Sequence, residues 1–426
     1  MSERAPLFRH DTATTLRSFF HCERSLTIAC AAWTPGVRRL EAKELLARAA
    51  WENSLTAGAI RERVFELRYP ERDLLTGTDT ALVKLFASVI HAPGAGAFLA
   101  AVGEVLVPAL LDAYGAYLEA SDVIADGPTR RFLNVARREK VLQRDAFVLA
   151  AGREDDGTLP SAQRRWVEDL AAAMAASGGF ARGAADTVGT PPRARPEVTF
   201  ELPQQPARDD RFLACSFYWP DNFDPKYPYG DGDRLRLRSA VSHLNEVWAV
   251  ETAGAILHGF ADPLGWDFIH DAARWLYDES RHMMMGATRM ETWGFETADI
   301  PLGSFIYESC RGQDPIYRLG MLAFFETKNI GKKKERAEEL GQIGDQISRR
   351  DMDFDWADEA IHAGYGRRWI KALLDAEKDG GRSWHEIVAR CEALVHKRIA
   401  DRTPEEERIT RSAAERLIEQ SKRLLG

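Results

Sequence analysis

Two short segments with the same pattern, DESRH and DEAIH, lie 80 residues apart in this chain of 426 residues. Each places a Glu three residues before a His, in the pairs Glu279–His282 and Glu359–His362. Of the ten histidines in the chain, only these two have a Glu at that spacing. Residues three apart on a helix lie on one face, so the Glu and the His of each pair can hold one metal ion together. The pattern therefore predicts two helices that present the same pair of metal-binding side chains.

A further Glu precedes each of these pairs by the same interval. Glu246 lies 33 residues before Glu279, and Glu326 lies 33 residues before Glu359. Carboxylates on otherwise apolar helix faces are costly to bury unless they are paired or bound to metal. The repeated interval therefore indicates two equivalent halves of one site, in which two metal ions would neutralise four carboxylates.

The first interval fits an antiparallel pair of helices. We expect one helix from Leu235 to Leu257 with Gly259 as its cap, then the turn ADPLGW, then a second helix from Trp266 to Trp293. Glu246 and Glu279 then each lie 13 residues from the turn, which is about 20 Å at the helical rise. The two carboxylates are therefore expected side by side.

The second interval fits another pair of helices with a longer connection. One helix begins at Asp314-Pro315, carries Glu326 and continues past Gly331, and the other runs from about Asp355 to Glu377. Two helices then supply a Glu each, and two supply Glu-x-x-His. This is the ligand set of carboxylate-bridged dimetal sites in four-helix bundles.

Three further acidic residues are candidates near this site. Glu251 is an alternative first ligand, but its shorter interval to Glu279 would place it nearer the turn, so Glu246 is preferred. Asp278 and Asp358 stand directly before the two ExxH glutamates. Metal-bound histidines usually donate their second N–H to a carboxylate or carbonyl, so these aspartates are candidates to accept it. The alternative for both is a solvated position on a helix.

The order Glu, ExxH, Glu, ExxH over residues 236–370 resembles the ferritin-like di-iron carboxylate superfamily. The stretches HLNEVWAVETAGAI, DESRHMMMGATRMETWGF and DWADEAIHAGYGRRW resemble more particularly a branch akin to the tRNA-hydroxylase type. The resemblance implies bridging by Glu279 and by Glu326 or Glu359. It also implies that six residues bind two irons and form the catalytic centre: Glu246, Glu279, His282, Glu326, Glu359 and His362.

By this resemblance, the chain is expected to be a non-haem di-iron oxidase or hydroxylase that uses O₂ as co-substrate. Mixed carboxylate and imidazole ligands suit Fe, with Mn as the alternative. About two thirds of the chain lies outside the bundle, which favours an enzyme acting on a small organic substrate. The alternatives are a ferroxidase or metal-handling ferritin-like protein, and a tRNA-modifying hydroxylase. An external electron donor and a homodimer remain open.

Composition limits the partners and the compartment. The net charge of −8 argues against a nucleic-acid partner, and the basic run Lys332–Arg336 is interpreted as a solvated helix face. The five cysteines form no CxxC pair and the N-terminus has no signal-peptide pattern, so a cytoplasmic protein is expected. The most apolar stretch is interrupted by Glu104, Pro108 and Asp112, which favours a buried helix over a membrane span.

Strand signals are scarce and helical periodicity is widespread, which predicts an all-α protein. We expect an N-terminal helical domain at 1–185, a Pro-, Gly- and aromatic-rich strap at 186–233, the ferritin-like bundle at 234–378 and a C-terminal helical extension at 379–426. The word TAGAI occurs in both the first and the third part, which suggests that the first is a degenerate, metal-free bundle. Its expected helices are Val37–Glu66, Asp79–His91, Ala95–Ala120, Thr129–Ala151 and Ser161–Ala176.

Overall fold

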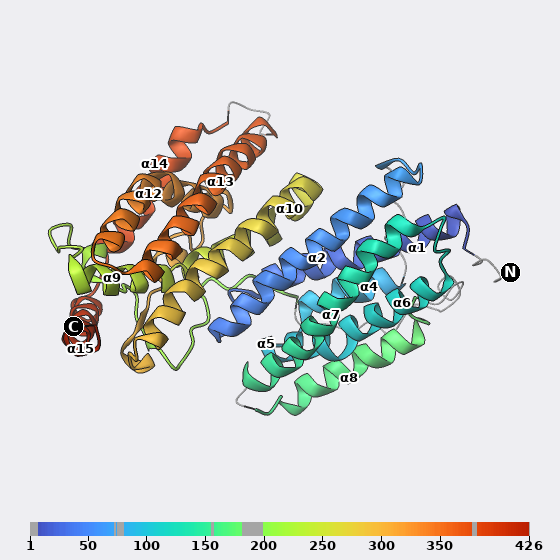
Figure 1. Cartoon of the computed structure of the whole chain (residues 1–426), viewed down its shortest axis with the longest axis horizontal. Coiled ribbons are helices and arrows are strands. Elements are labelled where there is room, and N and C mark those ends of the chain that lie inside the picture. The colour runs from blue at the N-terminus through green and yellow to red at the C-terminus, as the bar shows by residue number, and fades with distance from the viewer. Residues whose placement is uncertain are drawn as a thin grey trace. The chain divides into compact units, whose positions relative to one another are not determined.

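The structure is a computed structural model, which describes residues 7–71, 74, 81–154, 157–180, 199–376 and 381–425. These residues are almost entirely helical, so the predicted all-α class is confirmed (Figure 1). Within them, the strands are two short ones, β1 (Leu213–Ala214) and β2 (Pro301–Leu302), which pair in parallel. The expected helix start at Asp79, the helix end at Glu377 and residues 186–198 of the strap lie outside the described residues.

The chain divides into two compact units. The first contains Met1–Trp33 and Arg48–Glu201, and the second contains Thr34–Ala47 and Leu202–Gly426. The expected domain at 1–185 had placed Thr34–Ala47 with the first unit. The difference has a local cause, because Lys43 in this segment forms a buried ion pair with Glu251, with 3.0 Å between Nζ and Oε1.

Helices account for most of the described part of the first unit. They are α1 (Arg9–Trp33), α2 (Leu40–Glu66, whose first turns belong to the second unit), α4 (Ala81–Ser88), η1 (Val89–His91), α5 (Ala95–Ala101), η2 (Val102–Leu106), α6 (Val107–Ala120), α7 (Gly127–Glu154) and α8 (Ser161–Ala176). The helices expected from the sequence do not include α1, which contains several Thr, Phe and Cys residues. These residues have modest helix propensity, and burial of one face stabilises the helix instead.

The apolar run from α5 to α6 is one continuous helical segment, long and apolar enough to span a bilayer. Most of its side chains are buried within the protein, as expected for a core helix. A π-helical turn, Val102–Leu106, lies just before Pro108 and changes the helical hydrogen-bond pattern next to the residue that has no N–H to donate. Glu104 points outward and pairs with Arg164, with 2.5 Å between Oε2 and Nη1.

The second unit contains the candidate site. Its elements, besides β1 and β2, are η3 (Pro220–Asn222), α9 (Gly232–Leu244), α10 (Val247–Thr292), η4 (Thr297–Asp299), α11 (Phe305–Ser309), α12 (Ile316–Gln342), α13 (Gln346–Ala376), α14 (Trp384–Ala400) and α15 (Pro404–Leu424). The two C-terminal helices each begin with a capping box, Ser383 with Glu386 and Thr403 with Glu406.

The first pair of ligand-bearing helices differs from the prediction. The expected helix Leu235–Leu257 is broken, because α9 ends at Leu244 and α10 begins at Val247. Gly259 is not a cap, and the helix continues to Gly265, whose φ of +76° a residue with a Cβ rarely adopts. Gly265 therefore divides α10 into two helical halves within the segment where the sequence predicted a turn.

The two halves of α10 run antiparallel. Glu246 and His282 are 36 residues apart, which would be about 54 Å along a straight helix. The Oε2 atom of Glu246 nevertheless lies 3.3 Å from Nδ1 of His282. The chain must therefore reverse at Gly265, which brings Glu246 beside both Glu279 and His282.

The second pair of helices, α12 and α13, packs along its length with a connection at residues 343–345, where Gly344 has a φ of +81°. The helix α12 begins where Asp314-Pro315 predicted and continues past Gly331. The helix α13 begins at Gln346, nine residues before the expected start at Asp355. In Figure 1, α13 lies beside the second half of α10, and these two helices carry the ExxH pairs.

The described part of the strap is held in place by its aromatic side chains. Phe217, Trp219 and Phe223 are buried. The hydroxyl of Thr410 on α15 donates to the carbonyl oxygen of Phe217 at 2.8 Å. The strap thus packs on the helices that follow it and forms one wall of the cavity described below.

Candidate metal centre

The structure brings together all six residues that the sequence predicted as ligands. Glu279, Glu326, Glu359 and His362 each offer one atom, and these atoms lie within 4.8 Å of one another. Glu246, Glu279 and His282 form a second group by the same measure. Glu279 belongs to both groups, as expected of a carboxylate that bridges two ions.

Three helices and one break between helices supply these residues. Glu279 and His282 lie on the second half of α10, Glu326 on α12, and Glu359 and His362 on α13. All five are buried, with at most 4% of each residue exposed. Glu246 comes from the break between α9 and α10, immediately before α10 begins, and its side chain is 15% exposed. The cluster is therefore closed on most sides and open near Glu246.

One ring nitrogen of each histidine faces the glutamates. The Nδ1 atom of His282 lies 3.3 Å from Glu246 and 3.6 Å from Glu279. The Nδ1 atom of His362 lies 3.2 Å from Glu279 and 3.8 Å from Glu326. Both Nδ1 atoms and the Oε2 atom of Glu246 are buried, and none has a hydrogen-bond partner in the described part of the chain. Buried polar atoms rarely lack partners, and a metal ion would satisfy these three.

The other nitrogen of each histidine is held by an aspartate on the opposite helix. Nε2 of His282 lies 3.2 Å from Asp358, and Nε2 of His362 lies 3.4 Å from Asp278. A carboxylate only accepts hydrogen bonds, so Nε2 carries the hydrogen, and in a neutral ring Nδ1 keeps its lone pair for a metal. Arg281 pairs with both aspartates, at 2.6 Å to Asp278 and 2.9 Å to Asp358.

Glu251, the alternative first ligand, lies outside these groups. Its carboxylate is fully buried and is neutralised by Lys43 and Arg208. The geometry therefore brings Glu246, and not Glu251, to the other five residues.

Lys333 and Asp355 are parts of the site that sequence reasoning missed. The Nζ atom of Lys333 lies 2.5 Å from Glu359, 2.7 Å from Asp355 and 3.4 Å from Glu246. The interpretation of Lys332–Arg336 as a solvated face is therefore wrong for Lys333, which is 6% exposed. Burial lowers the pKa of Lys333, but the surrounding carboxylates outweigh burial and raise it above its usual value, so the ammonium stays charged.

Asp355 lies between the cluster and a deeper hydrogen-bond network. Its Oδ1 atom is 3.4 Å from Nδ1 of His282, and its Oδ2 atom is 2.9 Å from Nε2 of His243. It forms a further candidate metal group with His282 and Glu359. Burial raises the pKa of Asp355, but the cations Lys333 and His282 outweigh burial and hold it well below its usual value.

Helical spacing was the signal that could have identified both residues. Lys333 follows Glu326 by seven residues, or two turns, and Asp355 precedes Glu359 by four. The position equivalent to Asp355 on α10 is Trp275, whose Nε1–H donates to Glu279 at 3.0 Å. The two halves of the site therefore differ in charge. One half contains the carboxylate of Asp355 with the ammonium of Lys333 paired to it, and the other contains the neutral indole of Trp275.

The glutamates repel one another when no metal is bound. Burial raises the pKa of Glu359, and the charges of Glu279 and Glu246 raise it further, well above its usual value. Burial also raises the pKa of Glu279, but His282 and His362 outweigh burial and lower it to about 2. Divalent cations would remove this conflict by neutralising both carboxylates at once.

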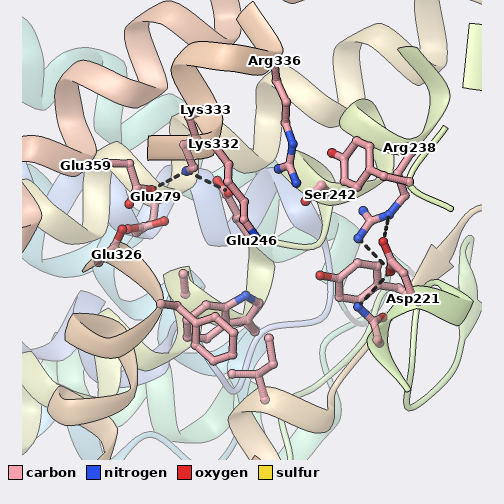
Figure 2. Close-up of a pocket in the computed structure, with 17 residues that line it drawn as sticks. Asp221, Arg238, Ser242, Glu246, Glu279, Glu326, Lys332, Lys333, Arg336 and Glu359 are labelled. Carbon is pink, nitrogen blue, oxygen red and sulfur yellow. Dashed lines mark hydrogen bonds and ion pairs between the residues drawn. The ribbon is translucent and has the colours of Figure 1, made fainter. Parts of the chain in front are cut away.

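A cavity of about 280 Å³ adjoins the cluster (Figure 2). The four glutamates line one end of it, and Arg336, Ser242, Arg238 and Asp221 lie toward the other. Apolar side chains also line it: Trp248, Ala249, Ile306 and Phe325. The cavity therefore connects the candidate metal positions to a space lined by both apolar and charged groups.

Two glycines lie where the helices of the site approach one another closely. A Cβ atom at Gly286 would lie 2.1 Å from the backbone nitrogen of Leu244, and one at Gly366 would lie 2.6 Å from the Cβ atom of Ala323. These residues permit α10 and α13 to approach α9 and α12 closely.

A protein-family model described as "Protein of unknown function (DUF455)" matches residues 171–414. This region is more than half of the chain and contains all six clustered residues and every residue that lines the cavity. Comparisons with curated proteins and with solved structures found no match. The chain therefore belongs to the DUF455 family of proteins of unknown function.

Proposed function

We propose that the six clustered residues hold two iron ions and that the protein is an O₂-dependent oxidase or hydroxylase of the ferritin-like di-iron type, acting on a small organic substrate. The observation that carries this proposal is the crossed arrangement of the two histidines. Each has its Nε2 atom held by an aspartate of the opposite helix, and its Nδ1 atom lies beside a shared glutamate without a hydrogen-bond partner among the described residues. This arrangement is typical of ligands oriented for metal.

The donor set fits iron or manganese better than zinc. The two principal groups offer four carboxylates and two imidazoles and contain no cysteine. Structural zinc sites are usually closed tetrahedra rich in thiolates, whereas oxygen-rich sites with imidazole suit iron and manganese. Two divalent ions would balance the four glutamate charges, which leaves Lys333 as a nearby cation.

A reduced di-iron centre supplies O₂ activation when it is bound. The protein supplies the surroundings for that chemistry. Trp248 and Phe325 form an apolar wall beside the glutamates, which limits water and gives a substrate a surface to pack against. The ammonium nitrogen of Lys333 lies 2.5 Å from Glu359, where it can stabilise negative charge on that carboxylate.

The proposal is tested by loading metal-free protein with enough Fe(II) to fill both positions and measuring O₂ consumption. We expect consumption to depend on Glu279, so Glu279→Ala should lose it, while the exposed Glu291→Ala on the same helix should keep it. Addition of excess Fe(II) separates the two enzyme classes. A ferroxidase would continue to consume O₂ and accumulate ferric iron, whereas the proposed enzyme would stop without a reductant and a substrate.

A further inference from the structure

The end of the cavity away from the glutamates contains an arginine with unused hydrogen-bonding capacity. Arg238 is 4% exposed and donates twice to Asp221, from Nε at 2.9 Å and from Nη2 at 3.0 Å. Its Nη1 group is buried and has no hydrogen-bond partner among the described residues. A buried guanidinium group with a free donor at a cavity wall indicates an acceptor supplied from outside the chain.

Arg336 is a second guanidinium at this end of the cavity. Its central carbon lies 3.9 Å from the centre of the Tyr229 ring, and no described carboxylate lies within ion-pair distance of it. Stacking uses the face of the guanidinium and leaves its edge N–H groups available. In Figure 2 it extends into the space between Glu246 and Arg238. The hydroxyl of Tyr229, which also lines the cavity, is buried and has no hydrogen-bond partner in the described structure.

The charges around the cavity favour an anion once metal is bound. Five acidic and four basic residues line it. Asp221 and Arg238 neutralise each other, and two divalent ions would balance the four glutamates. Asp355 pairs with Lys333 at 2.7 Å, so the remaining charges of the lining residues are those of Lys332 and Arg336, both positive.

We propose that Arg336, the free Nη1 donor of Arg238 and the Tyr229 hydroxyl bind the anionic group of the substrate, which is therefore a small organic acid. The anionic group is a carboxylate or a phosphate, because an arginine edge offers paired donors that match either one. The rest of the molecule lies along Trp248 and Phe325, toward the glutamates. This inference rests on the proposed function, because that proposal makes the cavity a substrate site. Binding of an anion in the cavity can nevertheless be measured without turnover.

The test compares benzoate with benzamide, which have the same shape and differ in charge. Binding is measured by calorimetry on the full chain loaded with Mn(II), whose content is determined beforehand, and on the metal-free protein. Inorganic phosphate is a third probe. Arg336→Gln removes the charge, Tyr229→Phe removes the hydroxyl and keeps the stacked ring, and Lys334→Gln is the matched control on an exposed neighbour.

We expect benzoate or phosphate to bind the Mn(II)-loaded protein at least about tenfold more tightly than benzamide. Arg336→Gln should remove this preference, Tyr229→Phe should weaken anion binding severalfold, and Lys334→Gln should change nothing. Tighter binding of phosphate than of benzoate would assign the substrate to organic phosphates, and the opposite order would assign it to carboxylic acids.

Equal binding of benzoate and benzamide, together with no binding of phosphate, would overturn the inference. An anion preference that survives both Arg336→Gln and Tyr229→Phe would also overturn it. Failure of the proposed function is a different result, namely the absence of bound Mn(II) or iron. Anion binding is then compared between the metal-free protein and its Arg336→Gln variant, which carry the same glutamates: weaker binding by the variant would support recognition of anions at this end of the cavity, and equal binding would overturn it.

Discussion

Asp358 on α13 accepts the Nε2 hydrogen of His282 on α10 at 3.2 Å, and Asp278 on α10 lies 3.4 Å from Nε2 of His362 on α13. Each ExxH helix thus orients the histidine of the other. The aspartates fix which nitrogen faces the glutamates and make that nitrogen more basic. We therefore expect Asp358→Asn to weaken metal binding about 10- to 100-fold, as measured by competition with a chromophoric chelator.

Asp353→Asn is the control for this substitution, because Asp353 is exposed on the same helix. It should leave metal affinity unchanged. If Asp358→Asn and Asp353→Asn bind metal equally well, Asp358 does not orient His282 for metal binding.

Lys333 competes with metal for the same carboxylates. Its ammonium contacts Glu246, Asp355 and Glu359, which would otherwise be buried without a cation. We expect Lys333→Met to destabilise the metal-free protein by about 3–5 kcal/mol and to raise its affinity for metal. Thermal unfolding with and without Mn(II) measures both effects, with Lys334→Met as the control. Weaker metal binding in Lys333→Met would show that the lysine instead positions the ligands.

Metal binding should release protons at neutral pH. Burial lowers the pKa of His362, but Asp278 and Glu279 outweigh burial and raise it to about 9 in the metal-free protein. Because the folded pKa is above the usual value of 6.5, the protonated ring stabilises the metal-free fold below about pH 6.5, and this stability is lost as the pH rises through about 9. A metal ion needs the neutral ring, so its affinity should rise over the same interval.

Calorimetry in two buffers with different ionisation enthalpies measures this release. At pH 7 we expect at least about one proton to leave as the site fills. A heat of binding that is independent of the buffer would mean that the histidine is already neutral or that it does not bind metal.

Glu246 and Glu251 should respond differently to the same substitution. Glu246→Ala removes one of the clustered ligands and should lose metal with a modest change in stability. Glu251→Ala leaves Lys43 without its buried carboxylate, so it should lower stability by about 3–5 kcal/mol and keep metal affinity. Chelator competition measures the metal affinity, and an unfolding titration measures the stability. Loss of metal in Glu251→Ala but not in Glu246→Ala would overturn the choice of Glu246.

The sequence predicted the clustered residues better than the helices that carry them. The 33-residue interval singled out Glu246, which the structure places beside Glu279 and His282, although Glu246 lies in a break between helices and not within one. Hydrophobic periodicity continues across such a break and therefore does not reveal it. The helix ends at Gly265, which lies within the predicted turn. The sequence alone does not distinguish it from Gly259, because either glycine could cap the helix.

The burial of Lys333 is a second feature that the sequence did not predict. Its neighbours Lys332 and Lys334 are exposed, so the run has the composition of a solvated face. The seven-residue spacing from Glu326 places Lys333 on the ligand-bearing face of α12, but its partner Asp355 comes from the other helix, α13. Contacts of this kind depend on the tertiary arrangement, which spacing within one helix does not specify.

The central claim is that this cluster of glutamates and histidines holds two metal ions, and the most direct test is the metal content of the full chain. The protein is purified after expression with added iron and analysed by inductively coupled plasma mass spectrometry, beside Glu279→Ala, in which the shared carboxylate is removed. We expect about two iron or manganese ions per chain in the unsubstituted protein and a loss of metal in the variant. A metal-free protein, or a metal content that Glu279→Ala leaves unchanged, would contradict it.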